Sequence, residues 1–138
     1  MPRESIALTR DELLAFLGEE QRCILGTLDA DGRPWPDAVA CLLRGDLLYI
    51  RVATGSRSHH NIQCDTRVCA VFERFPTYYE IKGATVHGRA LAVSGGHAFD
   101  AVPDPVAGAP VDDAQVYQLA LDDVVSFEFS KIKNRVTS

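Results

Sequence analysis

The spacing of apolar residues predicts a short helix followed by strands. Thr9 and Glu12 form a capping box, in which the threonine hydroxyl accepts from a backbone amide while the glutamate reaches back. An apolar stripe with helical spacing follows and ends near Gly18. From Cys23 onward the period changes to two, the period at which side chains alternate across a strand. The pattern therefore predicts one opening helix and then a sheet.

The strand-like segments alternate apolar and polar positions and are separated by turn residues. They cover 23–28, 38–43, 47–53, 67–74, 79–93, 116–121 and 124–129. Asp31-Gly32 supplies the turn of the first hairpin. In the third segment, Leu48, Ile50 and Val52 share one face, which we expect to be buried.

Two further segments complete the organisation. Residues 58–65 are polar and predict a short helix capped by Ser56 or Ser58. Residues 94–114 are rich in Gly, Pro, Ala and Asp, which favours an irregular excursion with at most one helical turn near 97–101. We predict a mainly β fold, a closed or nearly closed antiparallel barrel of six to seven strands with two or three short helices, forming a single domain over 1–138.

Charge and hydropathy exclude several classes of protein. Asp and Glu outnumber Lys and Arg by 19 to 14, giving a formal charge of -5, and no basic stripe offsets the repulsion from a polyphosphate backbone. No apolar run approaches the roughly 18 residues of a membrane span, and the first residues lack a signal-peptide layout. We predict a soluble, cytoplasmic protein with a small-molecule substrate and with no nucleic-acid or membrane partner.

The four cysteines form no CxxC pair, and we predict that they are reduced. A metal site made from His59, His60, Cys64 and Cys69 is conceivable, but these spacings match no zinc pattern. Buried free cysteine is common in protein cores. We therefore predict no metal.

The densest polar cluster runs from Arg51 to Asn61, where a strand leads through Gly55 into a helix start. A helix N-terminus offers unpaired amides, a glycine permits close backbone approach, and Arg51 and Arg57 supply planar charged donors. This combination suits an anion, above all a phosphate-bearing ligand. An ordinary capped turn with solvated arginines fits the spacing equally well, so both interpretations remain open.

The order of several short motifs resembles the pyridoxamine 5'-phosphate oxidase-like, FMN-binding split-barrel superfamily. The motifs are an opening hairpin GTLxxDGRPxxxxV from Gly26, a strand GDLLYI from Gly45, a loop SRxxxNI from Ser56, a strand start DxRV from Asp65 and a late strand GxxxxGRA from Gly83. Together they lie between residues 25 and 93, about half the chain.

The resemblance implies a split β-barrel homodimer with a flavin at the dimer interface. The residues that it implies for cofactor binding are Val39, Cys41, Arg51, Val52, Ala53, Thr54, Ser56, Arg57, Ser58, His59 and Asn61. Ser56 and Arg57 take the phosphate-loop positions, while residues 39–42 line the ring through backbone groups. Many relatives carry a lysine where this chain has Ser58, and the loss of that cation weakens phosphate binding unless Arg51 or His59 substitutes for it.

Three aromatic or basic residues are candidates for the substrate side. Trp35 is placed to stack on a ring ligand, or else to anchor a core or interface. Tyr79 and Lys82 are candidates to cover the same groove from a partner subunit. His87 lies in the middle of a strand, where a structural role is the simpler interpretation.

The chain shows no Ser-His-Asp order and no GxSxG elbow, so covalent hydrolysis has no support and no catalytic residue is identified. This fits a flavin oxidoreductase, because the isoalloxazine itself carries out hydride transfer. We predict an FMN-dependent oxidoreductase acting on a small conjugated substrate. The alternatives are an F420-dependent reductase and a non-catalytic protein that binds flavin or haem, the last with His59, His60 or His87 as axial ligand.

Overall fold

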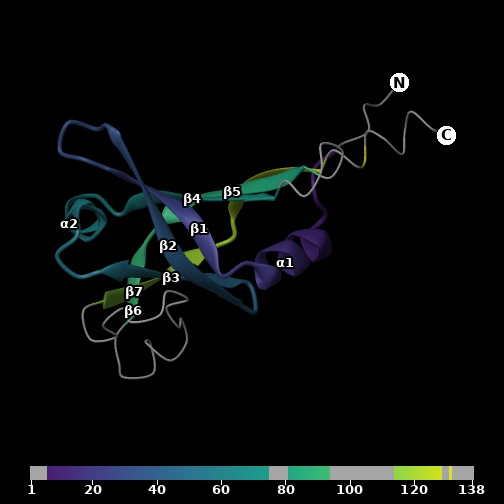
Figure 1. Cartoon of the computed structure of the whole chain (residues 1–138), viewed down its shortest axis with the longest axis horizontal. Helices are drawn as coiled ribbons and strands as arrows, with labels where there is room; N and C mark the ends of the chain where they lie inside the picture. The colour runs from purple at the N-terminus through teal and green to yellow at the C-terminus, as the bar shows by residue number, and fades with distance from the viewer. Residues whose placement is uncertain (1–5, 75–80, 94–113, 129–130, 132–138) are drawn as a thin grey trace.

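The computed structural model describes residues 6–74, 81–93, 114–128 and 131, which form two helices and eight strands (Figure 1). In chain order these are α1 (Arg10–Glu19), β1 (Arg22–Leu28), β2 (Pro34–Arg44), β3 (Leu47–Ala53), α2 (Arg57–Cys64), β4 (Arg67–Arg74), β5 (Lys82–Arg89), β6 (Leu91–Val93), β7 (Ala114–Ala120) and β8 (Asp123–Glu128).

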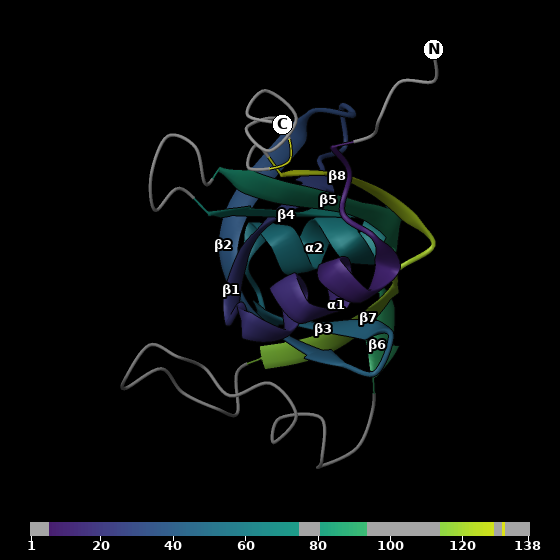
Figure 2. The same cartoon turned by 90° about the vertical axis from the view of Figure 1, so that its right-hand side faces the viewer.

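The strands form one sheet in the order β6-β7-β3-β2-β1-β4-β5-β8, and every neighbouring pair is antiparallel. The sheet curls around both helices, as Figure 2 shows. Gly88 of β5 helps the sheet to curl, because a Cβ there would lie only 2.7 Å from a methyl carbon of Leu119 on β7. The predicted mainly β barrel is thereby confirmed.

The inner face of the sheet carries the hydrophobic core. Leu48, Ile50 and Val52 of β3 are fully buried, which confirms the predicted alternation. The predicted hairpin turn is also present, because Gly32 adopts a positive φ of 77° between β1 and β2. Both features follow from local sequence pattern alone.

One helix lies at each end of the barrel (Figure 1). Helix α1 has both hydrogen bonds of the predicted capping box, and it buries Leu13, Phe16 and Leu17 against the sheet. Helix α2 is capped by Ser56, whose hydroxyl accepts from the backbone amide of His59. The alternative cap, Ser58, instead lies inside the helix and is buried.

The strand count exceeds the predicted six to seven. The predicted strand 79–93 is divided into β5 and β6, because the backbone amide of Ala90 donates to the carbonyl of Thr66 and leaves the ladder. Strand β2 begins at Pro34 rather than near residue 38. The last two strands are displaced by one or two residues from their predicted bounds. The predicted turn at 97–101 and Tyr79 lie outside the described residues.

All four cysteines are free thiols, and Cys23 and Cys41 lie in the core. A hydrogen bond with Cys41, together with burial, raises the pKa of the Cys23 thiol far above its usual range, so this thiol stays protonated. Within the described ranges, no three His, Cys, Asp or Glu side chains gather in a way that would hold a metal ion. None of the described helices is long and apolar enough to cross a membrane.

Candidate functional site

The predicted phosphate loop lies where β2 and β3 part. In the β2–β3 ladder, Arg44 pairs with Leu47 next to the turn, and the last pair is Ala40 with Arg51. The first part of β2, residues 34–39, pairs only with β1. Among the residues that the structure describes, that part of β2 therefore has an edge without a strand partner. We call the region formed by residues 34–39, the loop 54–56 and the first turn of α2 the β2–β3 opening.

The loop into α2 is held by three short-range hydrogen bonds. Gly55 has a positive φ of 82°, which lets its amide donate to Nδ1 of His59 at 3.1 Å. The Ser56 amide donates to the carbonyl of Ala53 at 3.1 Å, and the Ser56 hydroxyl caps the helix. Nδ1 of His59 accepts this bond, so the His59 side chain helps to hold the loop.

Arg57, the first residue of α2, is the arginine of the opening. Its guanidinium lies 4.9 Å from the centroid of the Trp35 ring, in cation–π contact. Arg33, Arg67 and Arg74 each form ion pairs with carboxylates, whereas no carboxylate in the described part of the chain pairs with Arg57. Its donors are therefore available to an anion from solution.

Two backbone amides add to these donors. The amides of Arg57 and Ser58 are the first two of α2, and the first amides of a helix have no acceptor within it. They sit at the positive end of the helix dipole, which favours negative charge. The side chain of Arg57 and these two amides together form a local anion-binding group.

The other predicted residues of α2 turn inward. Ser58 is fully buried and donates to Oδ2 of Asp37 at 2.9 Å. Asn61 is also buried and donates to Oγ1 of Thr27 at 3.0 Å. These two bonds tie α2 to β2 and β1, so both side chains position the helix and neither lies at the surface. Sequence reasoning missed Asp37 and Thr27, which lie 21 and 34 residues from their partners and follow no local motif.

The predicted residues on the strands fall on two different faces. Val39, Cys41 and Val52 are core residues, so they face a ligand only through their backbone. Arg51 is 6% exposed and points to the outer face of β3, opposite Ala40 and Val116 in the ladders. The structure therefore does not bring the Arg51 side chain onto the inner face, which α2 covers.

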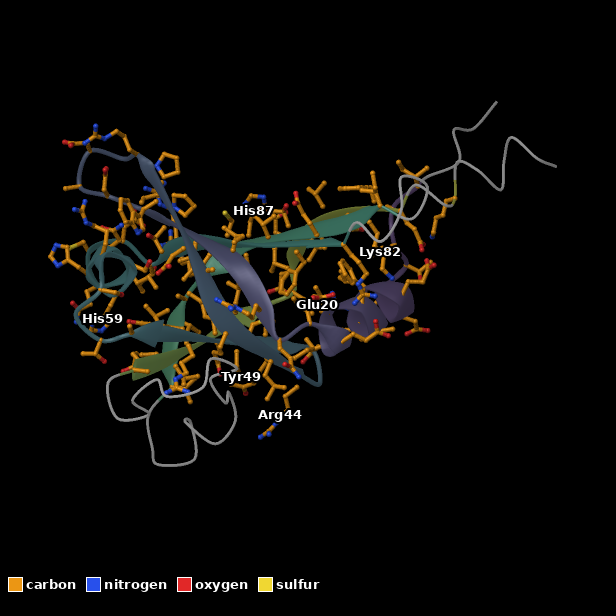
Figure 3. The ribbon with its side chains drawn as sticks, viewed as in Figure 1. Glu20, Arg44, Tyr49, His59, Lys82 and His87 are labelled. Atoms are coloured by element: carbon orange, nitrogen blue, oxygen red, sulfur yellow. The ribbon has the colours of Figure 1, made fainter. Side chains whose placement is uncertain are left out.

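The exposed predicted residues are similarly divided. Ala53 and Thr54 are exposed at the entrance to α2. Trp35 is 41% exposed and meets Arg57, so one substrate-side candidate lies in the opening. Lys82 instead lies over the Phe16 ring at 4.9 Å, beside α1, while His59 lies at the α2 end (Figure 3).

A pocket of about 310 Å³ adjoins Arg57 on the side of the first hairpin. Its lining residues come from the hairpin turn and from one face of α2: Asp29, Ala30, Asp31, Arg33, Arg57, His60, Asn61 and Cys64. Arg33 pairs with Asp29 and Asp31 at 3.3 and 3.1 Å. Backbone and side-chain donors of Arg33 also lower the pKa of Asp29, so the turn presents a charged, polar wall to the pocket.

Comparison with known proteins identifies the family. The family model described as pyridoxamine 5'-phosphate oxidase matches residues 9–134, so the chain belongs to this family. The predicted resemblance and the split-barrel fold are thereby confirmed. No curated protein sequence matches the chain.

Solved structures share the fold at low sequence identity. The conserved hypothetical protein Rv2991 from Mycobacterium tuberculosis has a TM-score of 0.80 at 20% identity, covering 96% of this chain and 92% of that one. A FAD-binding protein from Mesorhizobium loti has 0.71 at 16%, covering 88% and 96%. The heme storage protein HutZ from Vibrio cholerae has 0.68 at 15%, covering 91% and 96%. At these identities the likeness establishes the fold.

Proposed function

We propose that this protein binds a phosphorylated flavin, FMN, in the β2–β3 opening and acts as an oxidoreductase on a small conjugated substrate. The strongest support comes from Arg57, which lies at the N-terminus of α2 and forms no ion pair with a carboxylate of the described residues. A planar guanidinium beside two helix amides matches a phosphate in both charge and hydrogen-bond geometry.

The unpaired edge of β2 suits the ring of the same ligand. Backbone groups of residues 34–39 have no partner on β3, and a flavin ring carries both donors and acceptors along its edge. A flavin bound there supplies hydride transfer, while the chain binds, orients and shields it. Trp35 supplies an aromatic surface beside the phosphate group.

The functional unit that we propose is a homodimer in the cytoplasm. Within the described residues, the opening is lined by the edge of β2 and the start of α2, whereas a flavin-sized ligand is normally enclosed over most of its surface. A second copy would add walls, with Tyr79 and Lys82 as the residues expected from it. Light-scattering mass of the FMN-loaded protein tests this, and a clean monomer with bound FMN would overturn the dimer.

A second candidate function is non-catalytic binding of flavin, F420 or haem. It is favoured because two titratable side chains of the opening, Asp37 and His59, are both engaged in structural hydrogen bonds. For haem, Nε2 of His59 would be the iron ligand, and because a neutral imidazole that ligates through Nε2 keeps its proton on Nδ1, haem binding would replace the loop bond from the Gly55 amide. The names of two structural relatives, a FAD-binding protein and a heme storage protein, are consistent with this class.

The first experiment is titration of the purified protein with FMN, F420 and haem, followed by absorbance and fluorescence. The Arg57→Ala variant should weaken FMN binding by about 1.5–3 kcal/mol, the range for charge-assisted hydrogen bonds. Arg44→Ala is the matched control, because Arg44 is exposed at the distant end of β2 (Figure 3). Equal affinities of the two variants would remove Arg57 from the site.

Turnover separates the two candidate functions. Bound FMN that is reduced by a nicotinamide donor and reoxidised by a conjugated substrate supports the oxidoreductase. Saturable binding without reduction supports the carrier. A Soret band that is lost in His59→Ala supports the haem-binding protein.

A further inference from the structure

We infer that the anion site of the β2–β3 opening prefers a singly charged phosphate group, meaning a phosphodiester or the inner phosphates of a dinucleotide, over a doubly charged terminal phosphate. This inference rests on the proposed function and specifies its ligand class. It comes from the bond between buried Ser58 and half-buried Asp37, which places a carboxylate beside the second residue of α2, whose amide belongs to the anion site.

The charge around the first turn of α2 is nearly balanced before any ligand binds. Arg57 is the only Lys or Arg within α2. Ser58 is fully buried and its hydroxyl points 2.9 Å to Asp37, which places a carboxylate beside the helix start. No Lys or Arg of the described residues forms an ion pair with Asp37. The field at the site is therefore Arg57 and the helix dipole, opposed by Asp37, while the turn of Asp29, Asp31 and Arg33 across the pocket adds one further net negative charge.

This balance discriminates between classes of phosphate. A terminal phosphomonoester carries about −1.5 to −2 charges at neutral pH, whereas a diester carries a single charge. Arg57 and the amides compensate one charge well, and the second charge meets the carboxylate of Asp37 instead of another cation. A half-buried position strengthens this repulsion, because water screens it less than at an open surface.

The pocket beside Arg57 is placed to hold the second substituent of a phosphodiester. A phosphodiester has two substituents, and only one of them leads to the ring on the β2 edge. The pocket of about 310 Å³ shares Arg57 with the anion site and is lined by Asp29, Asp31 and His60, which suit the hydroxyl and amino groups of a sugar or nucleoside. A terminal phosphate leaves this pocket without a ligand group.

The test compares FMN with its synthetic monomethyl ester, which has the same ring and ribityl chain but one charge less. We expect wild-type protein to bind the ester about three- to tenfold more tightly, the effect of one like-charge contact near a protein surface. In Asp37→Asn, which keeps an acceptor for Ser58, this preference should disappear. Asp46→Asn, at the exposed β2–β3 turn, is the matched control and should retain it.

Two further variants test the charge preference and the pocket separately. Ser58→Lys should reverse the preference toward FMN if the helix accepts the lysine, and Asp37→Asn decides the question if it does not. Cys64→Trp, at an exposed residue of the pocket wall, should weaken FAD binding severalfold and leave the monomethyl ester unaffected.

The outcomes are distinct from those of the proposed function. FMN bound more tightly than its ester by wild type, or a preference unchanged in Asp37→Asn, overturns the inference while flavin binding stands. Failure of FMN, its ester and FAD to bind overturns the proposed function and this inference with it.

Discussion

The two ends of the barrel are closed by helices of opposite character. At the α1 end, Leu13, Phe16 and Leu17 are buried, and Arg74 pairs with both Glu19 and Glu20 while lying 5.3 Å from the Phe16 ring. Apolar packing and paired charges together hold this end.

The α2 end is closed by polar groups instead. Its buried residues include Ser58 and Asn61, each bonded to a strand, and its arginine meets an aromatic ring rather than a carboxylate. Helix α2 is thus fixed from beneath while Arg57 keeps its donors available. The α1 end therefore contributes stability, whereas the α2 end leaves the donors of Arg57 at the surface, where they can bind a ligand.

The largest expected effect is a loss of folding stability on changing the α1 end. Phe16→Ala removes a ring that is 2% exposed and packs edge-on against Phe72, so it should destabilise the fold by about 3–5 kcal/mol. Urea unfolding measures this loss. Flavin affinity per folded molecule should not change, because the site lies at the other helix. An affinity loss in the folded fraction would show that the two ends are coupled.

A smaller effect is expected at the polar anchor of α2. Asn61→Leu leaves the buried hydroxyl of Thr27 without its donor and should cost about 1–3 kcal/mol. The double variant Thr27→Val/Asn61→Leu should recover most of that loss, because it removes both polar partners. Thermal unfolding of the three proteins provides the measurement. A double variant as unstable as the sum of its single changes would contradict a pairwise anchor.

Trp35 provides a test of the surface of the same end. Trp35→Leu should weaken FMN binding by about 0.5–1 kcal/mol, because it removes the ring that holds the Arg57 guanidinium. A double-mutant cycle with Arg57→Ala separates two roles of the ring. If Trp35 acts by positioning Arg57, its substitution has no effect in the Arg57→Ala background. A full effect in that background would mean that Trp35 contacts the ligand directly.

The smallest effect concerns acid stability at the α1 end. A hydrogen bond from Lys131 and the amide of Thr9 lower the pKa of Glu12 from 4.5 to about 2. A lowered carboxyl pKa stabilises the fold above the unfolded value and loses this contribution as the pH falls. The stability difference between wild type and Glu12→Gln should therefore be full above pH 4.5 and fade toward pH 2. A stability difference that stays constant as the pH falls to 2 would contradict this expectation.

Local patterns in the sequence predicted most of the framework. The capping box at Thr9, the turn at Gly32 and the alternation in β3 each depend on residues close together in the chain, and each is present. The early start of β2 was missed because Pro34 and Pro36 argue against a strand. They are tolerated there because that part of β2 has no partner on β3, and a missing amide on that side breaks no ladder bond.

The site was predictable only in part. The loop glycine, the cap at Ser56 and Arg57 follow from the spacing of a strand end and a helix start. The inward turn of Ser58 toward Asp37, the contact of Arg57 with Trp35 and the outward direction of Arg51 depend on how distant strands pair. A single sequence carries no local signal for such contacts.

Trp35 is the single tryptophan of the chain and lies against the cation of the opening. Its emission therefore comes from one place, and that place is the proposed binding site. A ligand that absorbs in the near ultraviolet and binds beside Trp35 will quench this fluorescence by energy transfer. Changes far from Trp35 will leave the fluorescence almost unchanged. The fold thus carries its own optical reporter, and occupancy becomes measurable without any label.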